Sequence, residues 1–173
     1  TALAAQAAKT AGKRLGPLSA VFNSASLAKN PWHVARTRAS MTGAVLADAI
    51  VRADLNSVVL VGFSLGARVV TATAESLATR NEPRPRVQSM HLLGAAVGTR
   101  WEWRSVEPAV EGIIHNYFST NDKVLGAAYR VAEAGTKAIG CEGIPTTSRK
   151  IKNVNVSKVV RLHQDQLKAV SLR

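Results

Sequence analysis

The sequence predicts an α/β fold in which helices flank a mostly parallel β-sheet. Short apolar runs alternate with helical patterns along the 173 residues, as expected for βαβ units. The apolar runs are nearly continuous, which is typical of strands buried inside a parallel sheet. A composition of 46% hydrophobic and 20% charged residues fits a folded chain. We expect residues 1–173 to form a single domain, without internal repeats or an interdomain linker.

The first part of the chain predicts helices. Residues 2–15 are rich in alanine and lysine and predict a helix that ends at Gly16-Pro17. We interpret residues 1–29 as a helical or irregular lead-in. Asn30-Pro31-Trp32 predicts a loop that leads into an amphipathic helix ending near Ala53.

The strands follow from residue 57 onward. The run SVVLVGF at 57–63 predicts a strand buried on both faces, and the helix after it should span about Leu65 to Ala78. The other predicted strands are VQSMHLLGAAV, GIIHNYFS and NVNVSKVVRL, at 87–97, 112–119 and 153–162. Helical patterns follow the last two of these strands, at 124–135 and 164–170.

A serine occupies the turn between the first strand and its helix, in the pentapeptide Gly62-Phe63-Ser64-Leu65-Gly66. This G-x-S-x-G pattern occurs by chance in about one chain in twenty of this length. Its strand-turn-helix context makes it more specific, because a nucleophile elbow needs that context to project the serine hydroxyl from the sheet edge. We expect the glycines to permit close approach of neighbouring elements, and the Leu65 N–H to face a developing oxyanion.

A nucleophilic serine also needs a histidine base and an acid that orients it. In hydrolases with such an elbow the acid follows the serine in the chain and the histidine comes last. Asp122 lies directly after the predicted strand GIIHNYFS, at the same sheet edge as Ser64. It is our candidate acid, and the alternative is that it only caps the helix that follows.

His163 follows the last predicted strand and precedes the last helical pattern, where the base is expected. The alternative is a surface histidine at a helix start. His115 and His91 alternate with apolar residues inside strands, which indicates structural histidines. His33 precedes Ser64 and should lie near the start of a helix.

The remaining composition limits the other chemistry. The single Cys141 excludes an internal disulfide and a cysteine-based zinc site, and no metal-binding or phosphate-binding motif occurs, so we predict no cofactor. No apolar run approaches the roughly 20 residues of a membrane span, and the first residues lack the pattern of a signal peptide. The compartment is not predicted.

Lys and Arg number 23 against 11 Asp and Glu, a net charge of +12. This charge is either ordinary solvated surface or a docking face for an anionic partner. An anionic membrane or an acidic subunit fits better than nucleic acid, because 5% aromatic residues provide few stacking groups.

The segments VVLVGFSLGARVV and STNDKVLGAAYR, with Asn30-Pro31-Trp32 before them and NVNVS after them, resemble a known family. The chain is similar to the α/β-hydrolase-like family of transmembrane and coiled-coil domain proteins over about residues 15–168. The resemblance implies an α/β-hydrolase fold, a triad of Ser64, Asp122 and His163, and lipase or esterase activity.

One part of such a fold is missing from the sequence. The second oxyanion donor normally comes from a loop after an early strand, and the 56 residues before Ser57 contain no convincing strand. We therefore expect an α/β-hydrolase-type sheet that lacks its N-terminal strands, with the chain as the C-terminal portion of a larger hydrolase completed by a second polypeptide. The expected function is hydrolysis of a hydrophobic ester. The alternative is a non-catalytic hydrolase-fold module that binds an anionic membrane, nucleic acid or a partner subunit.

Overall fold

A single sheet of four parallel strands organises the molecule, which we analysed in a computed structural model that describes residues 29–172. The strands lie in the order of the chain: β1 (Ser57–Phe63), β2 (Arg86–Leu93), β3 (Ile114–Phe118) and β4 (Ile151–Asn155). All three strand pairs are parallel, so the carboxyl ends of the strands meet at one sheet edge. The predicted α/β class, with a parallel sheet flanked by helices, is confirmed. The predicted helix over residues 2–15 lies outside the described residues.

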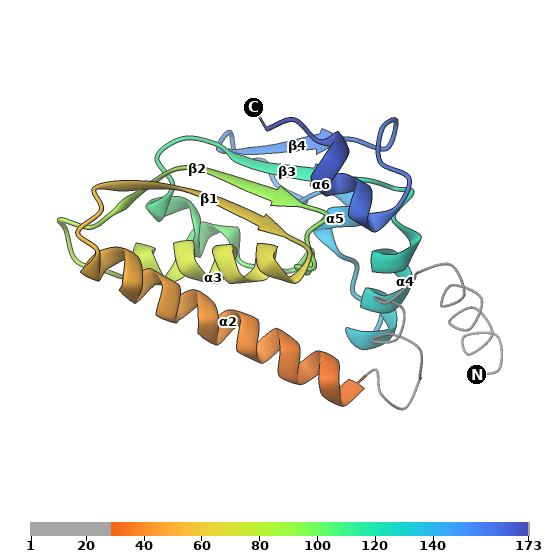
Figure 1. The fold of residues 1–173 in the computed structure, drawn as a ribbon, viewed down its shortest axis with the longest axis horizontal. Helices are drawn as coiled ribbons and strands as arrows, with labels where there is room; N and C mark the ends of the chain where they lie inside the picture. Colours follow the sequence, from red (N-terminus) through yellow and green to blue (C-terminus); the bar gives the residue numbers. More distant parts are fainter. Residues whose placement is uncertain (1–28, 173) are drawn as a thin grey trace.

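Two long helices, α2 (Lys29–Arg52) and α3 (Leu65–Ala78), cover one face of the sheet (Figure 1). They pack closely at Gly43, where an added Cβ would lie 2.5 Å from the carbonyl oxygen of Val69. The expected loop at Asn30-Pro31-Trp32 is wrong, because these residues form the first turn of α2. Proline is tolerated there because the first amides of a helix have no intrahelical acceptor.

The remaining helices are short, apart from α4 (Lys123–Ala132), and several of them lie near the carboxyl ends of the strands. They are η2 (Trp103–Ser105), η3 (Glu107–Ala109), α5 (Ile139–Glu142), η4 (His163–Asp165) and α6 (Gln166–Ala169). In Figure 1, α4, α5 and α6 lie at the end of the sheet toward which the strand arrows point.

Two apolar clusters lie on opposite faces of the sheet. The larger cluster includes Leu60, Met90 and Ile114 from the strands and Ala67 and Leu77 from α3. A smaller cluster joins strand residues to the C-terminal segment; its buried members are Leu93, Tyr117, Val156 and Val160. This second cluster attaches the last residues of the chain to the carboxyl ends of the strands.

Strand β1 differs from the prediction. It is an edge strand, and Val59 and Val61 are 50% and 48% exposed, so it is not buried on both faces. Within residues 29–172 no element pairs with its outer edge. The last strand also differs, because β4 ends at Asn155 and a turn follows, so His163 does not directly follow a strand.

Candidate active site

Ser64 occupies a strained turn between β1 and α3. Its φ of 53° and ψ of −119° lie in a region that non-glycine residues rarely adopt. Hydrogen bonds hold this conformation: the Ser64 N–H donates to Leu93 O at 3.0 Å, and Ser64 O accepts from the N–H groups of Ala67 and Ala96. Backbone strain of this kind persists only where surrounding structure imposes it, and it occurs often at functional sites.

The two glycines of the pentapeptide have different roles. A Cβ on Gly62 would lie 2.6 Å from both Ala67 Cα and Gly66 O, so only glycine fits there. A Cβ on Gly66 would meet nothing within 4 Å. The expectation that both glycines permit close approach is therefore right for Gly62 and wrong for Gly66.

Asp122 lies in the loop after β3, as predicted, and its side chain is fully buried. One oxygen, Oδ1, accepts the N–H of Leu125 at 3.0 Å and thereby caps α4. The other, Oδ2, lies 2.6 Å from Nδ1 of His163. The carboxylate therefore caps a helix and holds a histidine at the same time.

His163 lies in η4, on the C-terminal segment, with its side chain 14% exposed. With an ionised Asp122, the geometry places the proton of the neutral imidazole on Nδ1, which donates to Oδ2 and leaves Nε2 as an acceptor. The ring also packs against Phe63, with ring centroids 4.7 Å apart. Since Phe63 directly precedes Ser64, this contact fixes the imidazole next to the serine turn.

Hydrogen bonds between two loops bring His163 to Asp122. Ser119 Oγ donates to Val160 O at 2.9 Å, and Asn121 Nδ2 donates to Ser157 O at 2.8 Å. The Thr120 N–H donates to Ser157 Oγ at 3.0 Å. The loop after β3 thus holds the segment that follows β4. Sequence reasoning did not identify this contact.

The structure brings Ser64, Asp122 and His163 to one edge of the sheet, but it forms only one of the two hydrogen bonds expected in a triad. No hydrogen bond joins Ser64 Oγ to His163 among the contacts of the described residues. Such bonds often form only when substrate is bound.

Leu65 is the first residue of α3, and its N–H has no acceptor within residues 29–172. A groove of about 540 Å³ adjoins it, between α2 and the start of α3. The groove is lined mostly by apolar or small residues: Pro31, Val34, Ala35, Arg38, Ala39, Thr42, Leu65, Gly66 and Val69.

Gly94 and Gln166 also adjoin the site, and no sequence motif identified them. Gly94 follows β2 with a φ of +48°, and a Cβ there would lie 3.3 Å from Cε1 of His163. The Gln166 side chain would be slightly closer to that Cβ, at 3.2 Å. Gln166 is fully buried, and neither polar atom of its amide has a partner within the described chain. Its only signal in the sequence is its position three residues after His163.

The other histidines and the cysteine lie outside this group. His91 and His115 are buried in β2 and β3, and their rings stack with centroids 4.9 Å apart. Burial, followed by the charge of His115, lowers the pKa of His91. Burial, together with the nearby acids Asp122 and Glu142, raises the pKa of Cys141 to about 12. Residues 29–172 contain no group of three or more side chains suited to binding a metal.

The fold and these side chains define a class: an α/β protein with a serine on a strained strand-to-helix turn, beside an Asp–His pair at the same sheet edge. The chain belongs to the family described as protein of unknown function (DUF726), whose model matches residues 11–171.

Three relatives illustrate the similarity. An uncharacterized membrane protein of Caenorhabditis elegans is 32% identical over 156 residues, covering 88% of this chain and 25% of the relative. The transmembrane and coiled-coil domain-containing protein STS1 of Oryza sativa subsp. japonica is 32% identical over 141 residues, covering 80% of this chain and 21% of the relative. The probable lipase MIL1 of Saccharomyces cerevisiae is 30% identical over 146 residues, covering 82% of this chain and 13% of the relative.

The chain thus spans a quarter or less of the length of these relatives. None of the helices in residues 29–172 has the length and apolar character needed to cross a membrane. No solved structure matches the chain.

Proposed function

We propose that this protein is a serine hydrolase of the lipase or esterase type, with Ser64 as nucleophile, His163 as base and Asp122 as the orienting acid. The hydrogen bond of 2.6 Å between His163 and Asp122 is the observation that carries the proposal. It leaves Nε2 of His163 available to take a proton, close to the strained turn that presents Ser64. The name of the yeast relative, a probable lipase, supports the same reaction class.

The reaction begins when Nε2 of His163 removes the proton of the Ser64 hydroxyl while Oγ bonds to the ester carbonyl carbon. The carbonyl electron pair moves to oxygen, and the N–H of Leu65 donates to that oxyanion. As the intermediate collapses, His163 returns the proton to the departing alkoxide, which leaves as an alcohol. Water, activated by the same imidazole, then hydrolyses the acyl-enzyme.

The substrate we propose is a hydrophobic carboxylic ester. Leu65, the proposed oxyanion donor, is one of the residues that line the mostly apolar groove between α2 and α3, so the groove is our candidate site for the acyl chain. A volume of about 540 Å³ falls within the range of small-molecule sites, roughly 300 to 1,000 Å³.

We also propose that further polypeptide pairs with the outer edge of β1 and supplies the second oxyanion donor. Two observations support this: β1 is an edge strand whose outer side no element of residues 29–172 pairs with, and the relatives are several times longer. Native mass spectrometry of the protein isolated from its source should give an assembly or a chain heavier than 18.3 kDa. A fully active monomer of 18.3 kDa would contradict this proposal.

A fluorophosphonate probe tests whether Ser64 is an activated nucleophile, as the proposed hydrolase activity requires. The probe forms a covalent bond with a serine Oγ only when the hydroxyl is activated, so wild-type protein should be labelled and Ser64→Ala should not. Ser76→Ala, in the second half of α3, is the matched control for loss of a serine elsewhere and should stay labelled at Ser64. His163→Ala should lose most labelling. A folded wild-type sample that resists labelling at every pH would reject the activity and favour the alternative, a non-catalytic binding module.

A further inference from the structure

The segment that contains His163 presents an amphipathic surface to solvent. Its apolar members are exposed to 57%, 46% and 62%: Val159, Leu162 and Leu167. Its basic members are also exposed: Lys158, Arg161 and Lys168. We call these six residues the interfacial surface. Aliphatic side chains exposed close together in sequence, among lysine and arginine, form the kind of segment that contacts a membrane surface or a partner.

These side chains face outward because the backbone between them is fixed. Val160 and Gln166, which alternate with the exposed residues, are fully buried. The Asp165 carboxylate accepts the backbone N–H groups of Arg161 and Leu162, at 3.1 and 2.8 Å. The segment is therefore anchored through Val160 and Gln166, while its apolar and basic side chains remain exposed to solvent.

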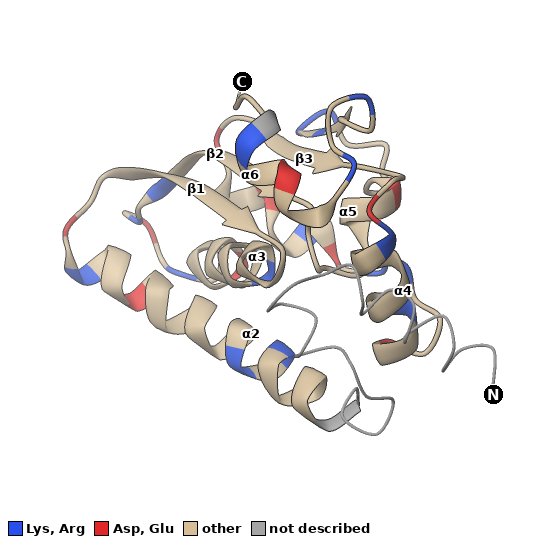
Figure 2. Ribbon diagram, turned by 45° about the vertical axis from the view of Figure 1, so that its right-hand side comes forward, with Lys and Arg blue, Asp and Glu red and all other residues tan. Residues whose placement is uncertain are grey.

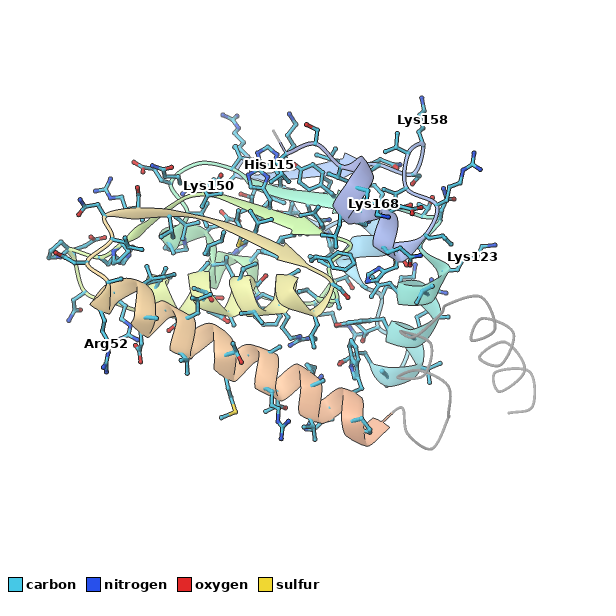
Figure 3. The ribbon with its side chains drawn as sticks, in the orientation of Figure 1. Arg52, His115, Lys123, Lys150, Lys158 and Lys168 are labelled. Atoms are coloured by element: carbon cyan, nitrogen blue, oxygen red, sulfur yellow. The ribbon has the colours of Figure 1, made fainter. Side chains whose placement is uncertain are left out.

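The charge of this surface is not compensated by neighbouring residues. None of Lys158, Arg161 and Lys168 takes part in an ion pair within the part of the chain that the structure describes. The one acid in residues 156–172 is Asp165, whose carboxylate faces backbone amides. Figure 2 shows lysine and arginine on α6 and on the neighbouring loop, and Figure 3 shows Lys158 and Lys168 near the carboxyl ends of the strands.

We propose that the interfacial surface docks this protein on a bilayer that contains anionic phospholipids. Three cations without partners complement a negatively charged headgroup layer, and the three aliphatic side chains can enter the boundary below it. Because Leu162 directly precedes His163, docking brings the proposed catalytic histidine to the lipid surface. That consequence rests on the proposed hydrolase function, whereas the docking itself does not.

The test measures binding of the Ser64→Ala protein to vesicles by co-sedimentation, so that no lipid is hydrolysed during the measurement. We expect binding to vesicles of phosphatidylcholine with about 30% phosphatidylserine, and much weaker binding to phosphatidylcholine alone. Combining Lys158→Gln, Arg161→Gln and Lys168→Gln should lower the partition coefficient by roughly 100-fold, from about fivefold per basic residue. Added salt should weaken binding of the unsubstituted surface.

Matched control variants make the same change in charge or in hydrophobicity at other sites on the surface. Arg52→Gln, Arg104→Gln and Arg149→Gln remove three exposed arginines that form no ion pair within residues 29–172. This triple variant should bind vesicles within about threefold of the parent. Salt screens charges that lie far from the membrane, so charges at the docking surface contribute more to binding than the net charge does. The double variant Leu162→Gln with Leu167→Gln should have a vesicle partition coefficient about tenfold or more below that of the parent. Its control is Met41→Gln with Val45→Gln, on the exposed side of α2, which should change the partition coefficient little.

The outcomes separate this proposal from the hydrolase. The docking surface would be overturned if the surface and control triple variants lost vesicle binding equally. It would also be overturned if folded protein bound neither vesicle type, even if the fluorophosphonate probe labels Ser64. Selective vesicle binding without any labelling of Ser64 would support the surface and reject the hydrolase. A protein partner on this face, in place of lipid, would leave the vesicles unbound and overturn the proposal in the same way.

Discussion

Nδ1 of His163 lies 2.6 Å from Oδ2 of Asp122, although 41 residues separate the two in the chain. The same aspartate accepts the N–H of Leu125 through its other oxygen. Helix capping and orientation of the histidine are therefore compatible tasks of one carboxylate. The two tasks use different atoms, so substitutions can separate them.

Asp122→Asn should abolish most activity while preserving the fold. Asparagine is a good helix cap, so its side-chain oxygen can still accept the Leu125 N–H. With its oxygen on the Leu125 N–H, the asparagine presents its NH2 group to Nδ1 of His163. That group can only donate, so it favours the wrong imidazole tautomer and cannot stabilise an imidazolium. A similar change in serine proteases lowers kcat on the order of 10⁴-fold. Hydrolysis of a soluble ester and urea unfolding measure the two effects.

Asp122→Ala provides the comparison, because it removes both interactions. It should lose the same activity and also about 1 kcal/mol of unfolding free energy from the missing cap. If Asp122→Asn instead keeps wild-type activity, Asp122 is a helix cap and not a member of a triad.

The sequence was sufficient to place the serine turn and its flanking elements. β1 and α3 have the bounds that were predicted, because a run of β-branched residues stops where an alanine-rich amphipathic pattern begins. Asp122 was placed in the correct loop for the same reason, since the apolar strand before it ends abruptly at Ser119. Both predictions depended on local signals only.

The surroundings of His163 were not predictable from local signals. Val156, Val159 and Val160 are β-branched, as in a strand, so the sequence predicts a last strand that continues past Asn155. In the structure, Ser157 binds Thr120 and Asn121, and the chain turns. The contact between Gly94 and the imidazole depends on two segments that are far apart in sequence. The exposure of Val59 and Val61 depends on whether another element covers their face of the sheet, which the strand's own residues do not encode.

Gly94→Ala should displace the imidazole of His163. The new Cβ would lie 3.3 Å from Cε1 of His163 and 3.2 Å from Gln166, and misplacement of a catalytic group by about 1 Å can lower kcat about 100-fold. The φ of +48° adds a stability loss of about 1 to 2 kcal/mol.

Gly135→Ala is the matched control for strain at Gly94. Gly135 also has a positive φ, of +89°, and an added Cβ there would meet nothing within 4 Å. It should show a comparable loss of unfolding free energy with unchanged kcat. Equal activity in the two variants would mean that Gly94 does not position His163.

The glycines on either side of Ser64 should tolerate alanine very differently. Gly62→Ala pushes a methyl group against the backbone of Ala67 and Gly66, and we expect a loss of about 1 to 3 kcal/mol or more in unfolding free energy. Gly66→Ala meets no neighbouring atom and should change stability by about 0.5 kcal/mol or less. Chemical denaturation midpoints of the two variants test this. Comparable midpoints would show that the turn at Ser64 is not packed as described.

The buried histidine pair on β2 and β3 should make stability depend on pH. His91 stacks on His115, which Figure 3 labels, and its Nδ1 lies 3.2 Å from the hydroxyl of Tyr117. Burial and the charge of His115 lower the pKa of His91 below its ordinary value of 6.5. Below that value the unfolded chain binds a proton that folded His91 resists, so the unfolding free energy should fall as pH falls below about 6.5.

His91→Gln tests the origin of this pH dependence. Glutamine keeps a polar group beside Ser89 and Tyr117 but does not titrate, so stability should fall less steeply between about pH 6.5 and pH 5 than in wild type. The control is His33→Gln on α2, which removes an exposed histidine and should leave the slope unchanged. Urea unfolding at a series of pH values gives the slope for each protein. An unchanged slope in His91→Gln would assign the pH dependence to other groups.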